Sequence, residues 1–209
     1  MSTLLHIDSS PLGDASISRN LSREFVQRWK QAHPQGEVIT RDLTATQFPG
    51  IDAQWISAVY TPPDSRTPVQ RELLALSDTL ISELERADEW VLGVPMHNFS
   101  VATLLKMWLD QVVRAGKTFS YINGSPVGLL KNKKAHFIIA SGGVYDPGSP
   151  AASFDFVQPY LEAIFGFMGV TDISFHRAGG AALINAGRTD RQTFLQPHIE
   201  SIRARFQPA

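Results

Sequence analysis

Four serines flank a glycine in the segment SSPLGDASIS, which begins at Ser9 and runs into a helical pattern near Ile17. A helix start offers free backbone N–H groups and the positive end of the helix dipole, and serine hydroxyls add further donors. The segment therefore predicts a phosphate-binding loop with Ser10, Ser16 and Ser18 as donors. The alternative is that Ser16 only caps the helix and the other serines lie in a solvated loop.

Missing motifs narrow the kind of phosphate that this loop could bind. The sequence contains no G-x-x-x-x-G-K-[ST], no G-x-G-x-x-G and no G-x-S-x-G. These absences argue against a P-loop nucleotide site, a dinucleotide pyrophosphate site and the common hydrolase elbow. A single terminal phosphate, as in a mononucleotide, fits the serine loop best.

The segment PMHNF at residues 95–99 stands directly after a buried apolar run. A flavin ring at a sheet edge needs hydrogen-bonding groups along its pyrimidine side and a wall against its flat face. Backbone groups of residues 95–99 and the amide of Asn98 could supply the first, and Met96 or Phe99 the second. Taken alone, an asparagine in this place is also a common cap of the following helix.

Gly142 and Gly143 follow another apolar run and could let the backbone approach a planar ligand closely. A Gly-Gly pair is also common in an ordinary turn, so neither this pair nor the segment at residues 95–99 is decisive by itself. Their coincidence with the serine loop at one edge of a sheet favours a flavin mononucleotide site.

Short apolar runs alternate with helical periodicities along the chain. This pattern shows which strands and helices the three loops connect. Strands are expected at residues 4–8, 37–41, 90–94, 135–140 and 172–176. Helices are expected at residues 17–32, 67–87, 101–113, 154–168 and 188–206. Thr67 and Pro68 are a suitable N-cap and first residue for the second helix, and Pro197 falls inside the last. Residues 42–66 contain several prolines and have no clear periodicity.

Strands separated by helices of this length need crossover connections, which gives a mostly parallel sheet. The sequence therefore predicts a flavodoxin-like, doubly wound α/β fold: a five-stranded parallel sheet with helices on both faces, in a single domain of residues 1–209. In such folds ligands bind beyond the carboxyl ends of the strands, where the strand order reverses. The loops after the first, third and fourth strands are thus the candidate site.

Composition excludes several other classes of function. The 209 residues have a formal net charge of -1 without a basic cluster, so we expect neither nucleic acid nor an anionic membrane as partner. The absence of cysteine excludes disulfides, thiol nucleophiles and thiolate metal sites, and we expect no metal centre. The amino terminus lacks a signal-peptide pattern and no apolar run is long enough to span a bilayer, so we expect a cytoplasmic protein.

Four stretches carry a resemblance to a known family. SSPLGDASISRNLS, PMHNFS, LKMWLDQVVRAGKTF and SGGVYD, in this order and spacing, resemble the FMN-dependent NADH azoreductases, a flavodoxin-like family of NAD(P)H:quinone oxidoreductases. The resemblance implies FMN as a tightly bound, non-covalent cofactor. The residues that it implies for FMN binding are Ser10, Ser16, Ile17, Ser18, Pro95, Met96, His97, Asn98, Phe99, Ala140, Ser141, Gly142 and Gly143. The chain departs from the family at His97, where members have Tyr, and at Ala140-Ser141, where they have Ser-Arg.

The resemblance also implies a ping-pong mechanism and a homodimer. Hydride would pass from NADH or NADPH to FMN, and then to a quinone or an azo compound in the same place. No catalytic side chain is required, although His97 could donate a proton. In this family the cleft lies between two subunits, which the amphipathic residues 104–113 with Trp108 could join. The aromatic residues available for the cleft are Phe119, Tyr121, Phe154, Phe165 and Phe167.

Two other classes of protein with related folds remain as alternatives. The first is a flavodoxin-like electron carrier, or a redox-sensing flavin-binding module, without enzymatic activity. Such carriers are usually shorter and strongly acidic, whereas this chain is near neutral. The second is a phosphoacceptor receiver domain, which needs clustered acids after its first strand and an aspartate after its third. Asp8 alone does not meet that pattern.

Overall fold

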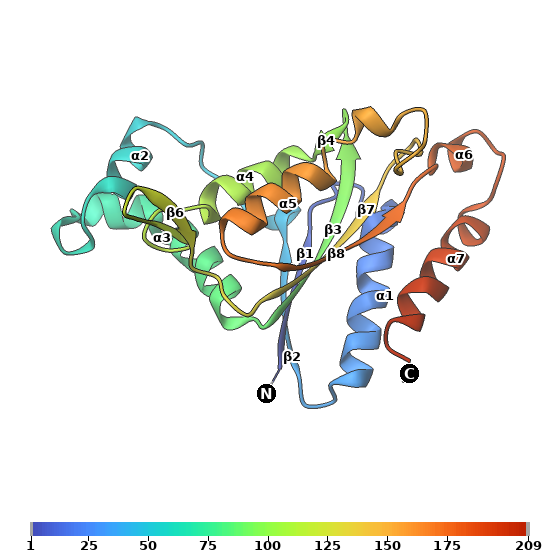
Figure 1. Cartoon of the computed structure of the whole chain (residues 1–209), viewed down its shortest axis with the longest axis horizontal. Helices are drawn as coiled ribbons and strands as arrows, with labels where there is room; N and C mark the ends of the chain where they lie inside the picture. Colours follow the sequence, from blue (N-terminus) through green and yellow to red (C-terminus); the bar gives the residue numbers. More distant parts are fainter. Residues whose placement is uncertain (1, 208–209) are drawn as a thin grey trace.

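Five parallel strands form the central sheet in the spatial order β2-β1-β3-β7-β8 (Figure 1). The computed structural model describes residues 2–207. The strand bounds are β1 Thr3–Asp8, β2 Glu37–Asp42, β3 Glu89–His97, β7 Lys134–Ala140 and β8 Asp172–Ala178. The predicted five-stranded parallel sheet is confirmed. Since the chain leaves β1 toward β2 and then returns to β3 on the other side, the strand order reverses between β1 and β3.

Helices cover both faces of the sheet (Figure 1), as predicted. The helices on one face are α3 Pro68–Arg86, α4 Thr103–Val112 and α5 Gln158–Phe167, and those on the other are α1 Ile17–Ala32 and α7 Arg191–Ala204. Strand β3 serves both layers, because successive side chains of a strand point to opposite faces. Trp90 and Leu92 join the core under α3, α4 and α5, whereas Val91 packs under α1 and α7.

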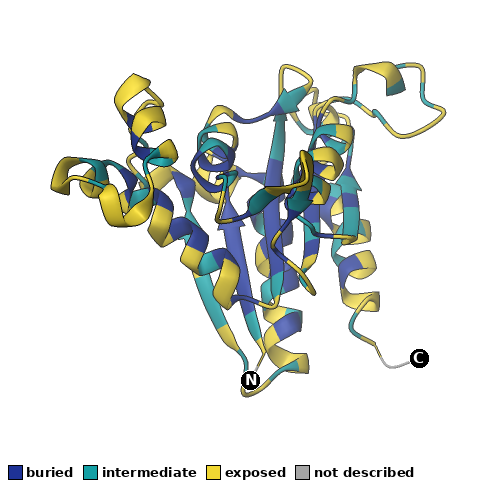
Figure 2. Ribbon diagram, turned by 60° about the vertical axis from the view of Figure 1, so that its left-hand side comes forward, coloured by how far each residue is buried: buried dark blue, intermediate teal, exposed yellow. Residues whose placement is uncertain are grey.

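The burial pattern shows the same two layers from another side (Figure 2), with buried strands at the centre and helices exposed on their outer faces. Trp108 of α4, expected at a subunit interface, is fully buried in the core of its own chain and stacks on Phe165. That expectation for Trp108 is therefore wrong. Within residues 2–207, no helix combines the length and the hydropathy that crossing a bilayer requires.

Helix starts follow the capping signals where these are present. Helix α3 begins after a capping box, in which Thr67 accepts from the N–H of Gln70 and the Gln70 side chain accepts from the N–H of Thr67. Helix α7 begins after Asp190 rather than at residue 188 as expected. Asp190 is the N-cap, and its carboxylate accepts from the backbone N–H of Thr193. Helix α5 begins at Gln158, four residues later than expected, because Asp155 accepts from the first free N–H groups.

Strand β3 is longer than the sequence predicts. Instead of ending in a loop at Val94, it continues to His97 and pairs antiparallel with the two-residue strand β4, Ser100–Val101. Asn98 and Phe99 form the turn of this hairpin, with φ angles of 48° and 68°. The predicted loop is therefore a short paired hairpin, called the β3-β4 arm below, that extends beyond the sheet edge.

Besides β4, several short elements have no counterpart in the sequence prediction. They are α2 Ala53–Tyr60, the hairpin strands β5 Phe119–Ile122 and β6 Ser125–Gly128, and α6 Ala182–Asn185. The β5-β6 turn contains Asn123-Gly124, both with positive φ, which is the typical residue pair of a two-residue hairpin. Helix α6 lies at the same end of the sheet as the β3-β4 arm (Figure 1).

Candidate cofactor site

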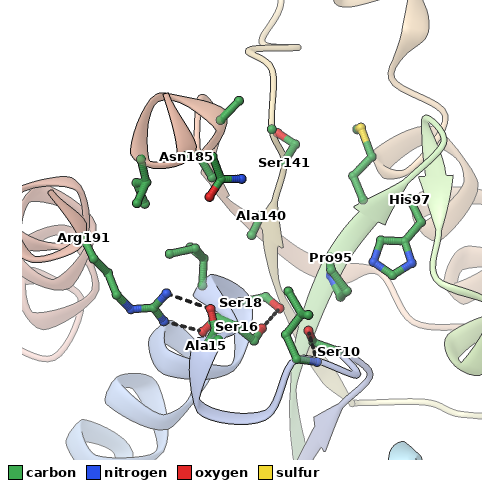
Figure 3. Close-up of a pocket in the computed structure, with 17 residues that line it drawn as sticks. Ser10, Ala15, Ser16, Ser18, Pro95, His97, Ala140, Ser141, Asn185 and Arg191 are labelled. Carbon is green, nitrogen blue, oxygen red and sulfur yellow. Dashed lines mark hydrogen bonds between the residues drawn. The ribbon is translucent and has the colours of Figure 1, made fainter. Parts of the chain in front are cut away.

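A cavity of about 280 Å³ opens at the carboxyl ends of β1, β3 and β7, beside the reversal of strand order (Figure 3). Ten of the thirteen predicted site residues line it: Ser10, Ser16, Ile17, Ser18, Pro95, Met96, His97, Ala140, Ser141 and Gly142. Sequence reasoning missed the other lining residues, which are Leu12, Ala15, Ala181, Ala182, Ile184, Asn185 and Arg191. The three loops expected to form one site thus lie together.

The first turn of α1 supplies donors to one end of this cavity. Ser16 Oγ accepts from the backbone N–H of Arg19 at 3.2 Å and so caps the helix. The N–H groups of Ile17 and Ser18 have no acceptor among the described residues, and both residues line the cavity. The Ser16 and Ser18 hydroxyls lie 3.2 Å apart beside them. Two free N–H groups next to serine hydroxyls form a suitable site for an anionic oxygen.

A buried arginine holds the serine loop from beneath. Arg19 donates to the Ser10 carbonyl at 3.0 Å, and its Nη1 and Nη2 donate to the two carboxylate oxygens of Asp42 at 2.6 and 2.9 Å. The Arg19 guanidinium holds the pKa of Asp42 well below its usual range, and the hydrogen bond to Asp42 raises the pKa of Arg19. Both groups therefore stay charged, and α1, β2 and the serine loop are joined.

A second polar network underlies the same loop. Ser22 Oγ donates to Asp8 Oδ1 at 2.8 Å and lies 3.0 Å from His6 Nε2, while Ser9 Oγ donates to the Gly93 carbonyl at 2.8 Å. A Cβ at Gly93 would lie only 2.8 Å from Asp8 Oδ1. The glycine inside β3 thus allows the close approach of the two strands and α1.

The two long walls of the cavity come from the β3 arm and from the loop after β7. The two walls adjoin, because Pro95 and Ala140 are paired residues of the neighbouring strands β3 and β7. Pro95 and His97 lie beside Ala140 and Ser141 (Figure 3), and Met96 also lines the cavity. They are mainly apolar or neutral surfaces, as a planar aromatic ligand requires.

Three predicted residues lie outside the cavity lining. Asn98 is exposed at the turn of the arm, and the ring of Phe99 packs 5.1 Å from Phe154. A Cβ at Gly143 would lie 3.0 Å from the ring of Tyr145, so the close approach at this glycine is to the chain itself.

The segment around α6 forms another side of the cavity. No sequence motif in this segment predicts that it would do so. The N–H groups of Ala181 and Ala182 donate to the carbonyls of Ser141 and Gly142 at 3.0 and 3.1 Å. These bonds hold α6 against the loop after β7, which brings Ile184 and Asn185 to the cavity. Pairing of two loops that are about 40 residues apart leaves no periodic signal in the sequence.

Arg191, at the start of α7, carries the one charged side chain among the described residues that line the cavity. Its Nη1 donates to the carbonyl of Ala15 at 2.7 Å and its Nη2 to that of Ser16 at 3.1 Å (Figure 3). Nη2 also donates to the carbonyl of Asp14 at 3.1 Å. The cavity therefore has a cation and no carboxylate in its lining, which suits an anionic ligand.

Comparison with known proteins agrees with this geometry. Residues 2–206 match the family model of the flavodoxin-like fold. An FMN-dependent NADH:quinone oxidoreductase of Acidobacterium capsulatum is 52% identical over 203 residues, which cover 97% of this chain and 98% of that protein. This chain belongs to the FMN-dependent NADH:quinone oxidoreductase family. A second member, FMN-dependent NADH:quinone oxidoreductase 3 of Burkholderia lata, is 49% identical over 206 residues, with 99% and 100% of the two chains covered.

Solved structures extend the family likeness to three dimensions. The azoreductase of Bacillus anthracis superposes with a TM-score of 0.87 at 25% identity over 99% of both chains. An FMN-dependent NADH-azoreductase of the same species, solved in complex with FMN, gives a TM-score of 0.86 at 25% identity, with 99% of this chain and 98% of that one covered. The predicted fold and family are thus confirmed for this member of the oxidoreductase family.

Proposed function

We propose that this protein is an FMN-dependent oxidoreductase that uses NADH or NADPH to reduce quinones and azo compounds, as one domain over residues 1–209. The names of the relatives at 52% and 49% identity support the cofactor, the donor and the quinone acceptor. The names of the structural neighbours support azo compounds as further acceptors. We rank quinones first, because a quinone takes up one hydride equivalent whereas cleavage of an azo bond needs two rounds of transfer.

The donor set at the first turn of α1 is the observation that carries the proposal. A phosphate monoester is a dianion with three strong acceptor oxygens near neutral pH. The unpaired N–H groups of Ile17 and Ser18, together with the hydroxyls of Ser10 and Ser16, offer four hydrogen-bond donors to these oxygens. The cavity lining thus fits the FMN phosphate.

The remaining walls suit the flavin ring. Bound FMN supplies the chemistry of accepting and giving up a hydride. In our proposal, Pro95, Met96 and His97 flank one edge of the ring and Ala140, Ser141 and Gly142 the other, and these residues exclude water from it. Asn98, Phe99 and Gly143 stay in the proposal as neighbours of these walls. His97, the side chain that could donate a proton, is exposed.

A homodimer is also part of the proposal. Phe99, Phe154 and Phe156 expose 43%, 50% and 56% of their surfaces, and the Phe156 N–H donates to the Phe99 carbonyl at 3.1 Å. An exposed aromatic patch of this kind beside a binding cavity is typical of an interface. Light scattering coupled to gel filtration should give twice the chain mass of 23.1 kDa.

Absorbance spectroscopy with NADH titration tests the enzymatic proposal directly. The purified protein, reconstituted with FMN, should show flavin absorbance bands that NADH bleaches under anaerobic conditions. Addition of a quinone should then restore the bands and sustain NADH consumption. Bleaching without sustained turnover would favour an electron carrier or a redox sensor, and a protein that binds no FMN would exclude both readings. Comparison of kcat/KM with NADH and with NADPH identifies the preferred donor.

A further inference from the structure

Arg191 is distant in sequence from the first turn of α1, yet it contacts the loop at that end of the cavity, where we place the phosphate. Arg191 is the first residue of α7, yet its guanidinium contacts the carbonyls of residues 14–16, which lie 175 to 177 positions earlier in the sequence. These carbonyls precede or belong to the residue that caps α1. Helix α7 is thus fixed to the loop that we assign to the phosphate.

Arg191 contacts the peptide unit that carries one of the two free N–H groups. The C=O of Ser16 and the N–H of Ile17 belong to one planar peptide unit, in which the two bonds point in opposite directions. The Ser16 carbonyl accepts from Arg191 Nη2 at 3.1 Å, and also from the backbone N–H of Asn20 at 3.3 Å and from Asn20 Nδ2 at 2.6 Å. The Ile17 N–H points the other way and has no acceptor among residues 2–207. Arg191 is therefore one of three donors that fix the peptide unit carrying this free N–H group.

The guanidinium also brings charge and spare donors. An arginine has five N–H groups, and the three bonds to carbonyls leave two of them without an acceptor among the described residues. The side chain lines the cavity and is the only cation in its lining among the described residues. Its charge therefore acts on an anion bound at the first turn of α1, with no lining carboxylate to offset it.

We propose that Arg191 makes this site selective for phosphorylated flavin, so that it determines the preference for FMN over riboflavin. The inference rests on the proposed function, because it assigns the phosphate of FMN to the first turn of α1. Riboflavin has the same ring and ribityl chain without the phosphate, so Arg191 has no anion to act on when riboflavin binds.

The test is a pair of binding titrations with the full-length, flavin-free protein. Quenching of flavin fluorescence measures Kd for FMN and for riboflavin in the wild type, Arg191→Gln and Arg191→Lys. Arg191→Gln should weaken FMN binding by about tenfold to a hundredfold, the range of a charge-assisted hydrogen bond, and change riboflavin binding by less than about twofold. Arg191→Lys retains the charge without the fork, and should lose a smaller part of the FMN preference.

Arg23→Gln is the matched control. Arg23 pairs with Asp14 of the same loop at 2.6 Å but is exposed and does not line the cavity. Its removal should leave both dissociation constants unchanged. Circular dichroism and thermal unfolding of each flavin-free variant check that it folds, and Arg191→Lys keeps the comparison informative if Arg191→Gln does not.

The outcomes separate the two proposals. Loss of FMN affinity with riboflavin affinity retained supports the role of Arg191. Equal weakening of both flavins, or no change in either, overturns that role while the proposed function stands. A wild type that binds neither flavin overturns the proposed function itself, and the role of Arg191 with it.

Discussion

Arg19 and Asp42 form a two-pronged ion pair, with Nη1 2.6 Å from Oδ2 and Nη2 2.9 Å from Oδ1. The pair joins the first turn of α1 to the end of β2, and the same guanidinium donates to the Ser10 carbonyl. Such forked pairing fixes the direction of the guanidinium as well as its charge. The serine loop thus rests on a fixed polar base rather than on solvent.

Arg19→Ala should destabilise the fold and disturb the serine loop. It leaves the carboxylates of Asp8 and Asp42 without their shared cation. We expect a loss of about 3 kcal/mol in the free energy of unfolding, at the lower end of the range for a broken buried pair because Asp42 is partly exposed. Urea unfolding measures it. Arg23→Ala, which removes an exposed pair, should lose far less, and an equal loss in both variants would contradict the prediction.

Ser16→Ala should affect both the stability of the protein and its flavin affinity. Ser16 caps α1 and lines the cavity, whereas Thr67 caps α3 through the same kind of bond and lies outside this cavity. Each Ala variant should lose about 1 kcal/mol in thermal or urea unfolding. Only Ser16→Ala should also weaken FMN binding, by roughly three- to tenfold in fluorescence titration. A similar loss of affinity in Thr67→Ala would refute a direct role of the Ser16 hydroxyl.

Gly93→Ala should strain the network beneath the serine loop. The added methyl group would lie 2.8 Å from Asp8 Oδ1, 3.2 Å from Ser22 Oγ and 3.3 Å from the Ser18 carbonyl. Overpacking of this kind typically lowers stability by about 1–3 kcal/mol, and displacement of Ser18 should weaken FMN binding as well. Gly50→Ala places its methyl group in open space and should change stability by less than about 0.5 kcal/mol. Chemical denaturation of the two variants side by side decides the matter.

Stability should fall in mild acid because of the pair His176 and His198, whose Nε2 and Nδ1 atoms lie 3.1 Å apart between β8 and α7. Burial lowers the pKa of His176 from 6.5 to about 4, with repulsion from His198 and Arg205 as further causes. Burial also lowers the pKa of His198. Because the unfolded chain binds these protons more readily, the stabilisation is complete above pH 6.5 and is lost as the pH falls toward 4.

His176→Asn is the variant that tests this pH dependence. Asparagine does not titrate in this range, so the unfolding free energy of the variant should fall less between pH 7 and pH 4 than that of the wild type. Urea unfolding at several pH values measures both curves. Parallel curves would show that His176 is not the group responsible.

The predictable parts of the structure are those in which neighbouring residues carry the signal. The apolar runs at residues 4–8 and 135–140 give β1 and β7 to within one residue, because strands buried on both faces are continuously apolar. The serine loop could be predicted equally well, because its hydroxyls and the helix that Ser16 caps are adjacent in the chain. The Thr67-Pro68 start of α3 followed from the same local chemistry.

The missed parts depend on contacts between distant residues. Pro95 indicated the end of a strand, but β3 continues because β4 pairs with it at the arm. The roles of Gly93 and Asp42 depend on side chains of α1, and no periodicity reports such a contact. Asn185 reaches the cavity from α6, which the sequence pattern did not predict, and Arg191 reaches it from α7, which the pattern placed only as a cover of the sheet.

The closure of residues 14–16 by Arg191 also sets an order of events during synthesis. Residues 14–16 are synthesised at least 175 residues before Arg191, so the nascent chain lacks one side of this cavity until α7 has been made. A nucleotide-like ligand therefore meets the complete cavity only after α7 has packed against the loop. Fragments that stop before α7 would expose the mouth of the sheet to other anions in the cell.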